Sequence, residues 1–178
     1  MRKLVTLGIV LFSLVATMAQ ENKPTGQSEK ARPDVARPDF SGTWLRDNAK
    51  SSGLQGAVAT AELTMVIAHN EPELKISRSL KLNDQPVTQE LVYYTDRRGE
   101  TNPATFGGTS LKSKTKWDKN KIETRASWST ETRGGEVNNF DSTEKWELGA
   151  EGKTLTYTID IASPRGVRTI KQVFNRVS

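Results

Sequence analysis

The clearest pattern in the chain is an alternation of apolar and polar residues that runs from Phe40 towards the C-terminus. In one segment Leu155, Tyr157, Ile159 and Ile161 alternate with threonines and an aspartate. Alternation with period two places every second side chain on the same face, so it predicts a β-strand with one buried face. The same alternation recurs over 63–68, 74–82, 87–93, 111–117, 122–128, 140–148 and 167–177.

Short turn segments separate these predicted strands, as at 96–99, 133–135 and 163–166, which are rich in Gly, Pro, Asp and Ser. Short links permit hairpins, whereas a parallel crossover needs about a dozen residues or more. The pattern therefore predicts an all-β fold, an antiparallel up-and-down meander of eight to ten strands. We expect this meander to close into a lipocalin-like barrel, because closure removes the exposed strand edges that promote aggregation. One or two helical turns fit only the Ala- and Gly-rich segment 48–61.

The N-terminal region follows a different pattern. Arg2 and Lys3 precede an apolar run over 4–16, and small residues at 17 and 19 fit a cleavage site, so we predict a signal peptide over 1–19. The apolar run is shorter than the roughly 20 residues of a membrane span; an uncleaved N-terminal anchor is the alternative. The polar segment 20–38 holds three prolines and is predicted to be a disordered Pro-rich linker. The β-barrel domain then covers 39–178. We expect a secreted or periplasmic protein with no stable membrane span after cleavage.

Composition narrows the function classes. The chain of 178 residues has a formal net charge of +5 and no cysteine. This modest charge shows no basic cluster, so nucleic acid is not an expected partner. A single histidine and no cysteine exclude the usual zinc sites. His69 stands at a strand end before Asn70-Glu71-Pro72 and is expected to be a surface or turn histidine. We expect no metal and no cofactor.

The folded part opens with Phe40-Ser41-Gly42-Thr43-Trp44. A Gly-x-Trp on the first strand resembles the calycin superfamily, which includes the lipocalins and the fatty-acid-binding proteins. The resemblance implies that Gly42 and Trp44 close one end of the barrel, with Arg176 of the last strand packed near the tryptophan. The Lys-Trp-Asp sequence at 116–118 resembles the fatty-acid-binding branch. The similarity is greatest to uncharacterised exported bacterial lipocalin-like proteins that begin with a Phe-Ser-Gly-Thr-Trp segment.

Two departures from that resemblance bear on the ligand. Fatty-acid-binding proteins hold the lipid carboxylate with an Arg-x-Tyr on the last strand, and the matching positions here are Gln172 and Phe174. The two-helix lid of that family also exceeds the length of segment 47–60. A classical fatty acid is therefore not the expected ligand.

Polar residues share faces with the apolar ones in several predicted strands. A filled core excludes such groups, because an unpaired buried polar group costs about 1–3 kcal/mol, whereas eight or more strands enclose room for a ligand. The alternative is that some strands are assigned to the wrong face or contain bulges. The residues in question are Arg78, Gln89, Ser113, Thr115, Thr124, Ser142 and Glu144. The expected ligand-binding residues are Arg78, Tyr93, Ile122, Trp128, Phe140, Glu144 and Trp146. Arg125 is a weaker polar candidate, because it is out of phase with the apolar residues of its strand.

The sequence predicts a barrel that binds a small hydrophobic or amphipathic molecule in its interior. The alternative is a non-enzymatic envelope interaction or structural protein that has a filled barrel and uses its outer surface. No nucleophile elbow, catalytic triad or phosphate-binding loop is visible. We therefore expect no catalytic residues and no enzymatic activity.

Overall fold

The computed structural model describes residues 37–82, 85–103 and 110–177. The predicted signal peptide and all but the end of the predicted linker lie outside these residues. In the described ranges, no helix is long and apolar enough to cross a membrane. The elements are β1 (Gly42–Ser52), α1 (Ala57–Thr60), β2 (Glu62–Asn70), β3 (Glu73–Leu82), β4 (Gln85–Tyr94), β5 (Glu100–Asn102), β6 (Leu111–Asp118), β7 (Lys121–Glu131), β8 (Val137–Leu148), β9 (Thr154–Ser163) and β10 (Gly166–Arg176).

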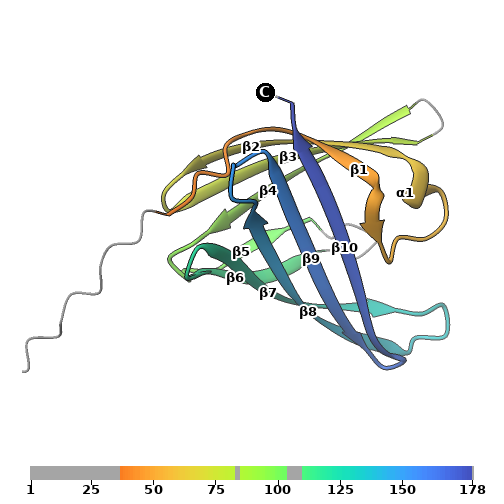
Figure 1. The fold of residues 1–178 in the computed structure, drawn as a ribbon. Helices are drawn as coiled ribbons and strands as arrows, with labels where there is room; N and C mark the ends of the chain where they lie inside the picture. The colour runs from red at the N-terminus through yellow and green to blue at the C-terminus, as the bar shows by residue number, and fades with distance from the viewer. Residues whose placement is uncertain (1–36, 83–84, 104–109, 178) are drawn as a thin grey trace, which may run out of the picture. The chain divides into compact units, whose positions relative to one another are not determined.

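The ten strands form one antiparallel sheet in the order β4-β3-β2-β1-β10-β9-β8-β7-β6-β5. The first and last strands pair directly, with Trp44 opposite Arg176 and Leu45 opposite Asn175. The sheet curls around its own interior, as Figure 1 shows with the orange β1 beside the blue β10. The predicted fold class, an antiparallel meander closed into a barrel, is confirmed.

The two edge strands of this sheet, β4 and β5, are joined mainly through side chains. The Asn102 amide replaces a strand partner: its Oδ1 accepts from Val92 N–H, and its Nδ2 donates to Val92 C=O, both at 2.8 Å. Gln89 Nε2 donates to the carbonyl of Pro103 at 3.0 Å. Edge strands expose unpaired main-chain groups that recruit other strands. The Asn102 amide satisfies both main-chain groups at Val92 and closes this seam.

One end of the barrel is a solid core around Trp44. Phe40, Trp44, Met65 and Phe174 are all 0% exposed. These side chains pack closely against one another and fill this end of the barrel. Trp44 Nε1 donates to the carbonyl of Phe40 at 3.0 Å, so the polar atom of the ring is also satisfied.

Arg176 covers the Trp44 ring at this closed end. Its guanidinium carbon lies 4.3 Å from the ring centroid. Its Nη1 donates to the carbonyl of Ser41 at 2.6 Å, and its Nε donates to that of Gly152 at 2.8 Å. Gly42 has a φ of 133°, a value that L side chains rarely adopt. The glycine thus lets the chain turn from Phe40 into β1, and the arginine fastens that turn to the last strand.

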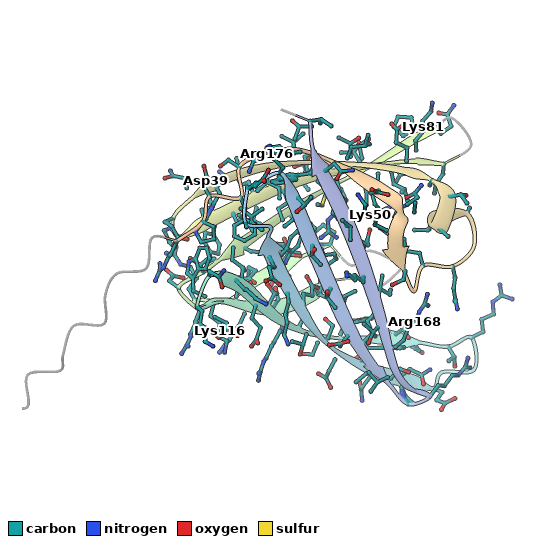
Figure 2. The ribbon with its side chains drawn as sticks, viewed as in Figure 1. Asp39, Lys50, Lys81, Lys116, Arg168 and Arg176 are labelled. Atoms are coloured by element: carbon teal, nitrogen blue, oxygen red, sulfur yellow. The ribbon has the colours of Figure 1, made fainter. Side chains whose placement is uncertain are left out.

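A polar cluster at the same end surrounds His69. The His69 side chain is 4% exposed, so it is not at the surface, although it does stand at the end of β2 just before the turn at 71–72. Its Nδ1 accepts from Phe40 N–H at 3.3 Å, and its Nε2 lies 2.9 Å from Glu71 Oε1. Because Nδ1 accepts, Nε2 carries the proton and donates to Glu71. Glu71 also accepts from Trp117 Nε1 and Thr95 Oγ1, each at 2.8 Å. Figure 2 shows labelled residues Asp39 and Lys116 at this end, and Lys81 and Arg168 at the other.

We predict that Arg176→Ala lowers the free energy of unfolding by about 2–3 kcal/mol, because it removes two charge-assisted hydrogen bonds and the cation–π contact. Arg176→Lys should recover only part of this loss, since lysine lacks the planar fork. Urea unfolding followed by tryptophan fluorescence measures both. Arg165→Ala, in an exposed turn, is the matched control. An Arg176→Ala variant as stable as that control would contradict the role of Arg176.

A second prediction concerns pH. Burial acts to raise the pKa of Glu71, but hydrogen bonds from Thr95, His69 and Trp117 outweigh it, and the net pKa lies below the ordinary 4.5. A carboxylate with a lowered folded-state pKa stabilises the fold above its unfolded pKa, and this contribution is lost as pH falls through the folded pKa.

Glu71→Gln should therefore destabilise the protein at pH 7 by about 1 kcal/mol, a value reduced because the carboxylate is partly exposed. The difference from wild type should shrink as pH falls below 4.5. Urea unfolding at a series of pH values measures it, with the exposed Glu136→Gln as control. A difference that does not change with pH would refute the assignment.

Candidate functional site

The other end of the barrel is hollow. A cavity of about 380 Å³ opens there, and apolar side chains form most of its wall. Its size falls within the range of small-molecule pockets, which is about 300–1,000 Å³. The apolar residues that line it are Leu54, Val58, Leu63, Leu80, Val87, Leu91, Pro103, Leu111, Trp128, Ile159, Ile161 and Ile170. The polar and phenolic residues are Arg46, Arg78, Thr88, Gln89, Tyr93, Ser142, Glu144, Tyr157 and Gln172.

The segment that contains α1 lies at the mouth and is held by Arg46. Arg46 is 6% exposed, and its Nη2 donates to the carbonyls of Val58 and Ala61, both at 2.6 Å. Its Nη1 donates to Gln172 Oε1 at 3.2 Å, and its Nε donates to Asn48 Oδ1 at 2.7 Å. Four of the five guanidinium N–H groups thus anchor this segment to β1 and β10. Figure 1 shows α1 beside the end of β1.

Opposite charges face the interior deeper in the cavity. Arg78 comes from β3 and Glu144 from β8, strands that lie far apart in the sheet order, on opposing walls. Glu144 is 4% exposed. Within the described ranges the two side chains form no ion pair within 4.0 Å. The site therefore holds a charge of each sign without direct neutralisation.

Aromatic rings surround Arg78. Its guanidinium carbon lies 5.1 Å from the ring centroid of Tyr157 and 5.4 Å from that of Trp146. The Trp146 and Tyr157 rings are 4.2 Å apart, and Tyr93 packs against Trp146 at 6.4 Å. A cation over aromatic faces is stabilised by the ring quadrupoles. These rings hold the guanidinium in place, and the Tyr157 hydroxyl also interacts by hydrogen bonding with Arg78 and with Glu144.

Several polar atoms here have no hydrogen-bond partner among the described residues: Arg78 Nε and Nη2, Ser142 Oγ, Glu144 Oε2 and Trp146 Nε1. Burial raises the pKa of Glu144 above its ordinary value, while the positive charge of Arg78 acts in the opposite direction. Burial and the nearby carboxylate also raise the pKa of Tyr157, so this phenol stays protonated. Buried polar groups normally find partners. Four of these five atoms belong to Arg78, Ser142 and Glu144, which line the cavity, and this part of the wall is the candidate site.

Other inward polar residues are satisfied within the protein. Ser113 Oγ and Thr115 Oγ1 donate to Glu100 Oε1 at 2.7 and 2.8 Å, and Thr115 Oγ1 lies 2.8 Å from Thr124 Oγ1. These three hydroxyls were expected to face a cavity. They form an internal network instead, because β5 brings Glu100 next to them.

Of the seven predicted ligand-binding residues, four line the cavity and three do not. Arg78, Tyr93, Trp128 and Glu144 line the cavity. Ile122 and Trp146 are 0% exposed members of the core, and they do not line it. Phe140 does not line it either, since its ring stacks on Trp128 at 5.3 Å. The position of a residue in the alternation predicts which face of the sheet its side chain is on, but not how far along the barrel axis it lies. The alternation therefore did not distinguish these three residues from the cavity lining.

Residues that the sequence analysis did not select complete the site. Tyr157 lies in the clearest alternating segment and faces inward, so its phase was a usable signal. No pattern in the sequence pointed to Arg46, because its role depends on its bonds to the segment that contains α1 at the mouth of the cavity. On the last strand, Gln172 lines the cavity and Phe174 is buried in the core. Arg125 is exposed and pairs with Glu123 at 3.1 Å, outside the barrel.

Comparison with known proteins yields structural likenesses only: no protein-family model matches the chain, and no curated protein matches its sequence. A solved chain described as "REP1-NXSQ fatty acid transporter" superposes with a TM-score of 0.56 at 14% identity, over 79% of this chain and 97% of that one. Zebrafish ileal bile acid-binding protein, complexed with cholic acid, gives a TM-score of 0.53 at 12% identity, over 78% and 98% of the respective chains. These likenesses show the fold alone: this chain shares the antiparallel barrel of these two proteins.

Proposed function

We propose that this protein binds a small hydrophobic or amphipathic molecule inside its barrel and does not catalyse a reaction. The observation that carries the proposal is the cavity of about 380 Å³, with apolar walls and unpartnered polar atoms on residues of its lining. Apolar pockets with a few placed polar groups are typical of small-molecule sites. An apolar ligand would remove this surface from water and gain about 25 cal/mol per Å² buried.

The comparisons support binding as the activity. Two solved chains that share this fold are described as a fatty acid transporter and a bile acid-binding protein complexed with cholic acid. Both descriptions name binding or transport of amphipathic molecules. The alternative of an interaction protein with a filled barrel fits the structure less well, because a filled barrel would not contain a cavity of about 380 Å³.

We predict that the neutral lipophilic dye Nile red binds with one-to-one stoichiometry and a rise in fluorescence. Ile159→Trp, which adds volume to the cavity wall, should weaken this binding at least about tenfold, because the larger ring occupies ligand space. The matched control is Val66→Trp, since Val66 faces outward and is 50% exposed. Circular dichroism checks that both variants fold.

Two outcomes would contradict the proposal. One is a wild-type protein that gives no dye signal at any concentration tested. The other is equal dye affinity for Ile159→Trp and Val66→Trp, which would place the dye on the outer surface.

We also propose that the protein acts after export, in the periplasm or outside the cell, and is related to the exported bacterial lipocalin-like proteins that its first strand resembles. The support is the sequence pattern of residues 1–19. Expression of the full chain in a bacterium should yield a mature form that begins at Gln20, found in the periplasmic fraction or medium. Intact-mass spectrometry measures this, and an uncleaved cytoplasmic chain would contradict export.

A further inference from the structure

We propose that the polar part of the cavity selects a ligand whose buried end is uncharged and both accepts and donates hydrogen bonds, such as a primary amide or a hydroxyl, and disfavours a carboxylate. This inference rests on the proposed function and specifies its ligand. The ligand class is an aliphatic molecule with such an end.

The argument starts from the unpartnered atoms. Arg78 Nε and Nη2 are donors that lack an acceptor among the described residues, and Glu144 Oε2 is an acceptor that lacks a donor. Ser142 Oγ, also without a partner, can serve in either direction. All three residues line the cavity. A ligand end that leaves either kind of atom unpaired leaves a desolvation cost in place.

A carboxylate satisfies only half of this site. It accepts from Arg78 but offers Glu144 no hydrogen, and it brings a second negative charge into an enclosed space. Like charges in such a space repel strongly, because the local dielectric screens them poorly. A primary amide of the same chain length offers a carbonyl oxygen to Arg78 and an N–H to Glu144. It adds no charge next to Glu144.

The surrounding groups reinforce this selection. Other residues of the lining that carry charge or a phenol are Arg46, Tyr93 and Tyr157. Arg46 is committed to the carbonyls of Val58 and Ala61 and to Gln172. These acceptors are neutral, so Arg46 keeps its positive charge, but that charge is held at the mouth by the segment that contains α1 and not beside Glu144. Arg78 is the cation that a ligand end meets, and Glu144 is the counter-charge on the opposite wall.

The test uses displacement of Nile red by two ligands that differ only in the head group, tetradecanamide and tetradecanoate, at pH 7.5. The wild type should bind the amide at least about tenfold more tightly than the carboxylate. Glu144→Gln, a near-isosteric change, should abolish or reverse this preference, since glutamine carries no charge and donates to a carboxylate. Arg78→Met should weaken amide binding about tenfold more than it weakens Nile red binding, which is measured directly on the variant.

The control is Glu147→Gln, on the same strand but on its outer face, where Glu147 pairs with Lys121 at 2.7 Å. Its amide preference should equal that of wild type. Should both ligands displace the dye equally from wild type, or should Glu144→Gln keep the full preference, head-group selection is wrong while interior binding stands. If the wild type binds no Nile red, the proposed function is contradicted, and so is the head-group selection that rests on it. If Arg78→Met fails to fold, Glu144→Gln still tests the proposal, provided that this variant is folded and binds Nile red.

Discussion

Pairing between β1 and β10 is the interaction on which the rest of the structure depends. It joins the two ends of the folded chain and turns a long meander into a wall that encloses space. Arg176 strengthens this junction at the closed end, where it covers Trp44 and binds the carbonyl of Ser41. Without this pairing the inward residues would face solvent, and neither the core nor the cavity would exist.

The enclosed space is divided into two regions of different chemistry. At the closed end polar groups have partners, as in the cluster of His69, Glu71 and Trp117. In the hollow end Arg78 and Glu144 keep unpartnered atoms. A protein selected for stability alone would pair or replace such groups, since each costs about 1–3 kcal/mol. Their retention next to a cavity is understandable if a ligand supplies the missing partners.

Periodicity in the sequence was sufficient for the fold and for part of the site. Alternation assigned Arg78 and Glu144 to the interior, because side-chain direction in a strand follows from phase alone. It failed where height along the barrel mattered, so Ile122 and Trp146 were not distinguished from the cavity lining. It also missed β5, whose three residues are too few to show a period. Glu100 of that strand satisfies Ser113 and Thr115, and its effect was therefore invisible from sequence.

At the seam between β4 and β5, the barrel wall is held together by different bonds than at its other strand pairs. Elsewhere a ladder of main-chain bonds resists separation, and most residue types can maintain such a ladder. At the seam the amide of Asn102 does this work for Val92. Closure there consequently depends on a few side chains, of which Asn102 makes two of the bonds. Its loss would leave the topology intact and expose the main chain of β4, the kind of surface from which strand-swapped oligomers and fibrous deposits grow.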